Sequence, residues 1–373
     1  GLRGVWNIDS TQNLELSYSY DRYDKARYVG GSRTHDHDYS NRQHILHGLY
    51  TRFLGRNGLT VGADYMNDYL TTYQFVDNEV HTQTSLDAFV QFDYNPLSWL
   101  NVVASVRDDY FSESDNNAVT SRLAALFKLK PLSVRASYSG GFRAPTLKEM
   151  YMCFDMAGIQ MIYGNPDLKP ERSHNFSLSA ERNGQVRRGL LAGSYSLAVS
   201  GYYNYYDSRI TTTDFPGTPE LEEGAVYTNE DGVKVMGADV TARYRASCGW
   251  GMSVSYNYLH TAGRTVDSQF TQPRPHSATW RMDYDKQICS AYRIYAGISG
   301  RYLSKPVSRY ETDGAYSLWK FTLQQRVWKG INVNFVVDNL LDYRPKVYYW
   351  NSAPTIGRIW SVGLSLDVND FFK

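Results

Sequence analysis

The sequence contains no long apolar run. Its 373 residues include no stretch that approaches the roughly 18 consecutive apolar residues expected of a membrane-spanning helix. Mean hydropathy is -0.49 and 21% of the residues are charged, values that on their own resemble those of a soluble protein. The sequence therefore excludes a bundle of membrane-spanning helices.

A charge excess of either sign is also missing. Lysine and arginine number 39 and aspartate and glutamate number 38, which gives a formal net charge of +1 at pH 7. Proteins that attract nucleic acid or acidic ligands through bulk electrostatics carry a marked basic excess. Composition therefore gives no indication of a nucleic-acid partner or of an acidic substrate.

Cysteine is scarce. Cys153, Cys248 and Cys289 lie far apart, without the Cys-x-x-Cys spacing of a metal-binding knuckle, and an odd number cannot pair completely within one chain. We expect Cys153 to be a free thiol in a loop. Cys248 and Cys289 both fall in predicted short turns, so a disulfide bond between them is conceivable.

Catalytic motifs are absent as well. The sequence has no Gly-x-Ser-x-Gly elbow, no His-Glu-x-x-His zinc motif and no glycine-rich phosphate loop. The adjacent glycines at 30–31 and 140–141 fall at predicted strand ends, where glycine serves turns and bulges. The sequence therefore predicts no enzyme, no catalytic residue, no resident metal and no intrinsic cofactor.

Aromatic residues, by contrast, are abundant: the chain has 32 Tyr, 15 Phe and 8 Trp. A transmembrane β-barrel explains both observations. Only every second residue of each strand faces lipid, so mean hydropathy stays low while Tyr and Trp gather at the two membrane interfaces. A large soluble all-β protein is the alternative.

Alternation of apolar and polar residues predicts the strands. Between 86 and 94, for example, the even positions are apolar, while Asp87, Gln91 and Asp93 lie on the other face. A polar face this rich in charge suits a wet lumen better than a sandwich core. This pattern predicts about seventeen antiparallel strands, near residues 1–9, 13–28, 44–54, 59–75, 81–96, 100–111, 118–131, 132–142, 173–184, 191–210, 225–246, 251–263, 276–287, 291–304, 315–328, 331–343 and 356–370.

The predicted connections alternate between short and long. Turn-forming residues mark the short ones, as at 55–58, 95–98 and 247–251. The long connections span 29–43, 143–172, 211–224, 264–275, 305–314 and 344–355. Short periplasmic turns and long extracellular loops are typical of outer-membrane barrels, and this alternation places the C-terminus on the periplasmic side.

The strand count indicates an incomplete barrel. Bacterial single-chain barrels have an even number of strands, and plugged outer-membrane transporters have about 22. The chain also opens inside a strand pattern, without a signal peptide. We therefore expect residues 1–373 to be a C-terminal piece that lacks the first strands and the plug, and so forms a C-shaped sheet. A miscount by one strand is the alternative.

Two boxes flank the long connection at 143–172. The first is Gly141-Phe142-Arg143-Ala144-Pro145 and the second is Gly164-Asn165-Pro166-Asp167-Leu168-Lys169-Pro170-Glu171. Together they resemble the corresponding region of TonB-dependent outer-membrane receptors, especially haem receptors. Val337-Asp338-Asn339-Leu340-Leu341-Asp342-Tyr343 resembles the penultimate-strand motif of that family, so the resemblance extends over the whole chain.

The resemblance implies a function and a location. Such receptors lie in the outer membrane of Gram-negative bacteria, in contact with its lipids, and capture a scarce metal-bearing ligand. The TonB–ExbB–ExbD complex then pulls on a plug, which is not recognisable in this sequence. Haem is the ligand that the boxes indicate, and a surface lipoprotein that carries it is a possible partner. Cobalamin or a ferric siderophore is the alternative within the class; a docking barrel for a lipoprotein, or a passive porin, lies outside it.

The resemblance also singles out ligand-binding residues. Haem receptors of this type carry a His between the two boxes that can coordinate iron, but no His occurs there in this chain. We expect Met156 at the equivalent position, with Cys153 and Tyr151 near the macrocycle and Arg143 bonded to propionates. The predicted set also includes Tyr163, which precedes the second box, and Asn165, which lies within it. The alternative is that both boxes simply build the loop.

A second candidate lies in the connection at 29–43. His35 and His37 alternate with Asp36 and Asp38, a pattern that could bind a divalent cation or present an imidazole to a ligand above the lumen. A solvated polar loop is the alternative.

Overall fold

Antiparallel strands make up most of the chain. The structure, a computed structural model, describes residues 1–33, 38–77, 79–113, 116–156, 158, 160–189, 191–263, 273–307, 314–328, 330–346 and 356–368. Within these ranges no helix is long and apolar enough to cross a membrane.

In the described part of the chain seventeen long strands form the sheet, and their number and order agree with the sequence prediction. They are β1 (Leu2–Asp9), β2 (Gln12–Lys25), β5 (Tyr39–Leu54), β6 (Asn57–Thr71), β7 (Val80–Leu97), β8 (Leu100–Phe111), β9 (Asn116–Leu129), β10 (Leu132–Arg143), β13 (Glu171–Val186), β14 (Gly193–Phe215), β15 (Gly224–Ala246), β16 (Trp250–Ala262), β17 (His276–Gln287), β18 (Arg293–Leu303), β19 (Tyr316–Trp328), β20 (Ile331–Asp338) and β21 (Ile359–Leu366).

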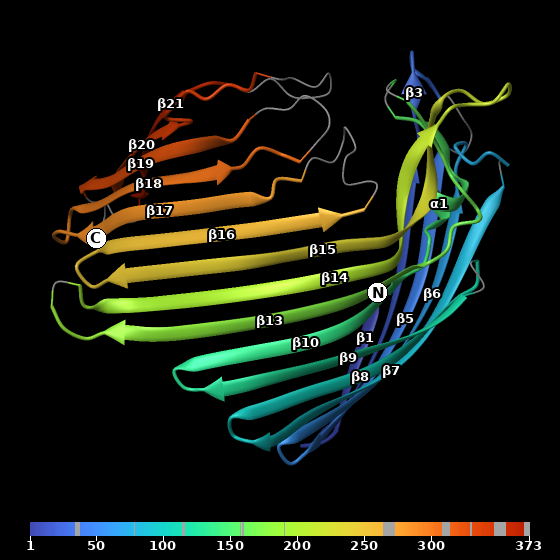
Figure 1. Cartoon of the computed structure of the whole chain (residues 1–373), viewed down its shortest axis with the longest axis horizontal. Coiled ribbons are helices and arrows are strands. Elements are labelled where there is room, and N and C mark those ends of the chain that lie inside the picture. The colour runs from blue at the N-terminus through green and yellow to red at the C-terminus, as the bar shows by residue number, and fades with distance from the viewer. Residues whose placement is uncertain are drawn as a thin grey trace.

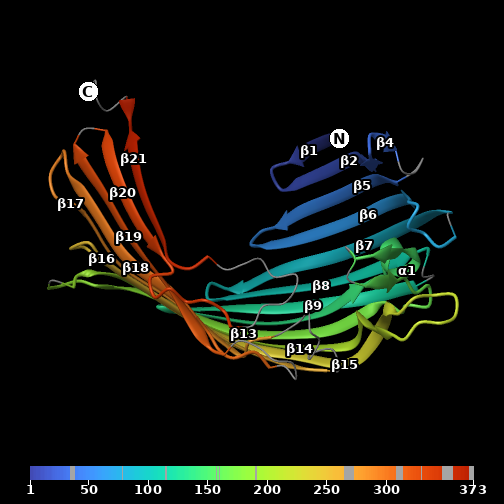
Figure 2. The same cartoon turned by 90° about the horizontal axis from the view of Figure 1, so that it is seen from above.

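The sheet is a single curved wall. Each long strand pairs antiparallel with the next one in the chain, from β1 to β21. Figure 2 shows that the wall curls into a trough, with β1 and β21 along its two rims. Among the described residues β1 pairs only with β2 and β21 only with β20. Among the residues that the structure describes, the sheet is therefore open.

The two faces of the sheet are inverted relative to a soluble protein. On β7, Leu86 is 54% exposed on the outer face, whereas Asp87 beside it is 8% exposed on the concave face. On β13, Leu178 is 59% exposed, and Ser177 lies on the concave side. Because side chains alternate along a strand, one register places most of a strand's apolar residues outward. An apolar outer face around a polar interior is typical of a barrel wall in lipid.

The ends of the sheet also differ. Short turns join the strands at one end, here called the turn end; Gly55, whose φ of 65° favours glycine, begins the turn between β5 and β6. Longer connections join them at the other, here called the loop end. Figure 1 shows the ends of β14 and β15 bending away from the sheet at the loop end.

Several predicted boundaries are wrong. β5 begins at Tyr39 rather than at 44, and β6 ends at Thr71 rather than at 75. The connection at 211–224 is shorter, because β14 continues to Phe215 and pairs with β15 up to Gly224. The strand predicted over 331–343 ends at Asp338 instead. Asn339 has a φ of 48°, and its side chain accepts from the Tyr343 N–H at 2.9 Å and donates to the Tyr343 carbonyl at 2.8 Å, which closes a tight loop.

The long connections contain short elements that the alternation did not predict. A small hairpin, β3 (Tyr28–Val29) with β4 (Ser32–Arg33), follows β2. The connection after β10 contains α1 (Leu147–Tyr151), β11 (Cys153–Asp155) and β12 (Met161–Tyr163). β12 pairs with β11 and, in parallel, with the start of β15. All three cysteines are free thiols, so the conceivable disulfide bond is not present.

The inverted faces predict opposite responses to charge at neighbouring positions. Leu178 lies near the middle of β13 on the outer face, so Leu178→Lys should lower the free energy of unfolding in lipid vesicles by about 2–4 kcal/mol. Ser177→Lys, one residue away on the concave face, should change it little. Urea unfolding followed by tryptophan fluorescence measures both. Equal losses for the two variants would contradict the assignment of faces.

Candidate functional site: the box loop and the inner wall

The connection from 144 to 170, here called the box loop, begins with a capped helix at the loop end (Figure 1). Thr146 accepts the Glu149 N–H at 3.2 Å through its hydroxyl, and Glu149 accepts the Thr146 N–H at 2.9 Å. This capping box satisfies two backbone donors that a helix start leaves unpaired. The Thr-x-x-Glu sequence therefore explains why α1 starts at Leu147, directly after its N-cap Thr146.

Arg143 clasps both ends of the box loop. Its Nε and Nη2 donate to the two carboxylate oxygens of Glu171 at 2.9 and 3.0 Å. Its Nη1 donates to Glu149 at 2.8 and 3.1 Å. One guanidinium thus ties the end of β10 to the helix and to the start of β13. Because every one of its nitrogens already faces a carboxylate, the predicted propionate-binding role would require part of this clasp to open.

Residues of the second box also make contacts that stabilise the fold. The Asn165 side chain donates to the Tyr227 carbonyl at 3.0 Å and accepts the Asp167 N–H at 2.9 Å. Gly164 passes so close to α1 that a Cβ there would lie 2.6 Å from the Met150 carbonyl oxygen, which explains the glycine. The hydroxyl of Tyr163 donates to the carbonyl of Glu222 at 2.9 Å.

A small apolar core holds the box loop against the wall. Leu70 on the concave face of β6, Phe75, Leu147 and Met152 form one buried cluster. The Cys153 N–H donates to the Gln74 carbonyl at 2.7 Å, which extends this contact to the connection between β6 and β7. The box loop is therefore a packed part of the concave side.

An ionisable cluster surrounds Tyr151. Its ring stacks on His81 at 3.7 Å between centroids, and its hydroxyl donates to the Glu113 carboxylate. The Nε2 of His81 lies 3.0 Å from an Asp77 oxygen. Burial, reinforced by the Glu113 hydrogen bond, raises the pKa of the Tyr151 phenol, so the phenolate that would bind iron is disfavoured. Sequence analysis missed this cluster because its members come from three separate segments.

Cys153 and Met156 retain functional groups for which the structure records no hydrogen bond. Cys153 pairs with Tyr163 across the β11–β12 ladder, and both are predicted ligand residues. Burial raises the pKa of the Cys153 thiol. Met156 is half-buried, and its N–H donates to the Gln160 carbonyl at 2.9 Å. The remaining predicted residues, His35 and His37, lie outside the described residues.

The concave wall carries an acidic row that the sequence analysis did not single out. His47, Asp64, Asp87 and Asp109 lie opposite one another on β5, β6, β7 and β8. Arg107 bonds Asp87 at 2.9 Å and Asp109 at 2.8 Å, and His47 contacts Asp64. One guanidinium faces three carboxylates, so this part of the wall is negative.

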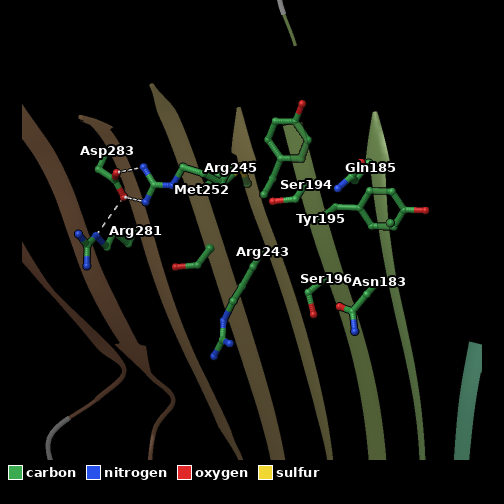
Figure 3. A pocket seen from close by; sticks show the side chains of 13 residues that line it. Asn183, Gln185, Ser194, Tyr195, Ser196, Arg243, Arg245, Met252, Arg281 and Asp283 are labelled. Atoms are coloured by element: carbon green, nitrogen blue, oxygen red, sulfur yellow. Dashed lines mark hydrogen bonds and ion pairs between the residues drawn. The ribbon is translucent and has the colours of Figure 1, made fainter. Parts of the chain in front are cut away.

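Further round the wall the charge is reversed. A hollow of about 720 Å³ near the turn end is lined by Arg243, Arg245, Arg281 and Asp283. Figure 3 shows Arg245 and Arg281 converging on Asp283, at 2.6 Å and 3.1 Å, while Arg243 stands apart. Three arginines and one aspartate line this hollow, so this part of the wall is positive. The inner wall thus has two patches of opposite charge, which suit the binding of a charged polypeptide or ligand. No metal-binding cluster exists among the described residues.

Loss of the clasp should loosen the box loop. Arg143→Gln leaves Glu149 and Glu171 without their shared cation, which should speed exchange of the Gly164 and Asn165 amide hydrogens by about tenfold or more, the effect of losing a charge-assisted hydrogen bond. Hydrogen-exchange mass spectrometry measures this. Arg135→Gln, on the same face of β10, removes the same charge outside the clasp. If both variants exchange alike, the clasp does not hold the loop.

The buried thiol should react as a weak nucleophile. Because the pKa of Cys153 is raised, its thiolate fraction near neutral pH falls below that of a free cysteine peptide added as a reference, and thiolate is the reactive form. Iodoacetamide should alkylate Cys153 more slowly, and the ratio of the two rates should rise from about pH 7 to about pH 9. Peptide mass spectrometry gives both rates. A ratio that does not change with pH would contradict the raised pKa.

Comparisons with known proteins agree with this architecture. The family described as "TonB dependent receptor-like, beta-barrel" matches residues 1–340. The vitamin B12 transporter BtuB of Photobacterium profundum is 28% identical over 246 residues, which cover 64% of this chain and 36% of that protein. The chain therefore spans only about a third of this curated relative.

Solved structures share the fold at low identity. The siderophore receptor PirA from Pseudomonas aeruginosa matches with a TM-score of 0.71 at 17% identity, over 98% of this chain and 62% of PirA. The FrpB iron transporter from Neisseria meningitidis matches with a TM-score of 0.65 at 14% identity, over 95% of this chain and 60% of FrpB. The predicted barrel wall is confirmed, whereas the narrower resemblance to haem receptors stays a prediction. The chain belongs to the TonB-dependent receptor-like β-barrels, multi-pass proteins of the Gram-negative outer membrane.

Proposed function

We propose that this chain forms the wall of a receptor that takes up a metal-bearing ligand across the outer membrane. Among the candidate ligands we rank a corrinoid first. The observation that carries this proposal is the match of residues 1–340 to the receptor family, together with the similarity to a vitamin B12 transporter. The box loop and the charged inner wall supply contacts for a ligand that enters at the loop end.

Haem is the second candidate, favoured by the resemblance of the two boxes. Its predicted contacts are partly engaged elsewhere. The donors of Arg143 bond Glu149 and Glu171, and the Tyr151 hydroxyl bonds Glu113. Cys153 and Met156 remain as soft ligands, although a buried thiol with a raised pKa is a poor source of thiolate. These contacts favour testing the corrinoid before haem.

The energy source and partners follow from the family. TonB–ExbB–ExbD would act on a plug, which together with further strands would close the open sheet between β1 and β21. A surface lipoprotein that delivers the ligand is a further candidate partner. The family consists of receptors, and the proposed work is tight binding followed by release on a conformational change.

Ligand binding separates the candidates. Full-length protein purified in detergent is titrated with cyanocobalamin, ferric haem and a ferric siderophore, and binding is followed by calorimetry and by the visible absorption of each ligand. We expect sub-micromolar binding of cyanocobalamin that Met156→Ala leaves unchanged. If cyanocobalamin does not bind, and haem gives a Soret shift that Met156→Ala weakens, the proposed ligand is haem and not a corrinoid.

Uptake in cells tests the transport itself. Accumulation of the bound ligand should require both this protein and TonB, because the family couples uptake to the inner membrane. The Leu178→Lys and Ser177→Lys variants provide a matched pair that separates loss of the folded wall from loss of transport. Accumulation that continues without TonB would favour a passive porin.

A further inference from the structure

A three-residue pattern recurs on the outer face of the sheet. Arginine and histidine stand two residues apart in Arg42-Gln43-His44 on β5, in Arg172-Ser173-His174 on β13 and in Arg274-Pro275-His276, which leads into β17. Because alternate residues of a strand share a face, Arg42 and Arg172 lie on the same side as their histidines, whereas Arg274 precedes the first residue of β17. Each histidine is two residues before an outward position of its strand, at 46, 176 and 278, so all three lie outward.

Each of these histidines is bonded to a tyrosine on the preceding long strand. In every case the phenol oxygen lies within hydrogen-bonding distance of Nδ1 and the two rings are stacked. The pairs are Tyr18–His44 at 2.8 Å, Tyr138–His174 at 2.9 Å and Tyr256–His276 at 2.7 Å. Their ring centroids are 6.2, 6.1 and 6.1 Å apart. One geometry is thus built three times.

The three pairs also lie at the same depth. Tyr18, Tyr138 and Tyr256 are each six residues after the first residue of β2, β10 and β16, and all three strands run from the turn end to the loop end. The register places each histidine diagonally across, two residues nearer the loop end. A general aromatic girdle requires aromatic residues at this level but does not require the same Arg, His and Tyr in each copy.

Outward arginines at the other end of the strands locate that depth in the membrane. Arg52 on β5 and Arg182 on β13 lie eight residues beyond His44 and His174, with mainly apolar or small outward residues between them. Eight residues extend about 26 Å along a strand, which a tilt of about 40° reduces to roughly 20 Å of membrane thickness. The three histidines therefore stand at the extracellular boundary of the apolar band. The arginines of the Arg-x-His pattern lie just above that boundary.

The chemistry of each copy fits a phosphate group. With Nδ1 accepting the phenol hydrogen, the neutral imidazole carries its proton on Nε2, which is then a donor. The arginine adds a planar fork of donors that matches phosphate oxygens. A tyrosine at this level keeps its ring in the apolar band and its hydroxyl in the headgroup layer. Phosphate is the anion that lipid headgroups present there.

The three copies differ in how open they are. In the copy on β2 and β5, Arg42 lies over the Tyr69 ring at 5.2 Å and makes no ion pair among the described residues. In the second copy, His174 Nε2 is 3.3 Å from an Asp207 oxygen and Arg172 donates to the Asn117 carbonyl at 3.5 Å.

In the third copy, Arg274 donates to the Ser304 carbonyl and lies over the Tyr316 ring at 5.0 Å. Its guanidinium is therefore partly engaged at the loop end of the sheet. The first copy leaves the most donors available. Arg22, opposite Arg42 in the register, adds a further cation there, although its Nε bonds Asp24 at 2.6 Å.

We propose that these three Arg-x-His/Tyr modules bind the phosphate groups of lipid headgroups in the extracellular leaflet of the outer membrane, and that the module of Tyr18, Arg42 and His44 binds most tightly. The modules then anchor the wall at a fixed height and surround it with phosphorylated lipid. This inference rests on the membrane location of the wall and is independent of the transported ligand.

Lipid binding to the full-length protein in a non-ionic detergent tests the proposal. Native mass spectrometry is recorded with bisphosphorylated lipid A and with the same lipid after removal of its phosphates. Wild-type protein should retain the phosphorylated lipid and bind the dephosphorylated form about tenfold more weakly, the effect of losing a charge-assisted hydrogen bond. Tyr18→Phe and Arg42→Gln should each weaken binding of the phosphorylated lipid, and the double variant should remove one bound lipid.

Two matched variants serve as controls. Tyr20→Phe removes a hydroxyl from the ring that also contacts His44 but shares no hydrogen bond with it, and Arg135→Gln removes a cation from the inner wall. Both should bind lipid like the wild type, and heat-modifiable migration on gels should confirm that every variant is folded. The proposal is wrong if Tyr18→Phe and Arg42→Gln bind as the wild type does, or if both forms of the lipid bind equally. Displacement of the lipid by millimolar inorganic phosphate would likewise overturn the assignment to a lipid headgroup.

Discussion

A chain that crosses hydrocarbon must pair every backbone N–H and C=O within the protein, because no water is available to replace a lost hydrogen bond. This wall meets that requirement through one continuous antiparallel ladder from β1 to β21. The ladder fixes the direction of every side chain, since neighbouring residues of a strand point to opposite faces. The apolar outer surface and the charged interior are both consequences of that geometry, and only the two rims remain unpaired among the described residues.

The polar interior imposes a second requirement: charged side chains on the concave face need partners of opposite charge where bulk water is limited. On the concave side Arg107 is shared by Asp87 and Asp109, and Asp283 is shared by two arginines. Arg143 applies the same principle at the loop end, where one guanidinium neutralises Glu149 and Glu171. In this structure residues of the two boxes help to build the loop: Arg143 and Glu171 form the clasp, and Gly164 allows a close backbone approach to α1. Such residues define the loop without defining its ligand.

The sequence predicts the long strands well because alternation is a local signal that each strand carries by itself. Its errors occur where pairing or loop conformation overrides that signal. Phe215 extends β14 through pairing with Gly224, and the positive φ of Asn339 ends β20 early. The small elements within the box loop escaped prediction because three-residue strands depend on their neighbours. Of the predicted ligand residues, which stay a prediction, Cys153 and Tyr163 pair across the β11–β12 ladder. Tyr151 contacts His81 and Glu113, which come from distant segments that the sequence does not connect.

By itself the sequence determined the class of the protein, the number and position of its long strands, and which residues face lipid, because each of these follows from a period of two along a single strand. Only the tertiary structure decided which groups remain available for binding. It engages Arg143 with two glutamates, places His81 on Tyr151 and joins three Arg-x-His segments to tyrosines on other strands. The register between strands decides such contacts, and no single strand carries that information.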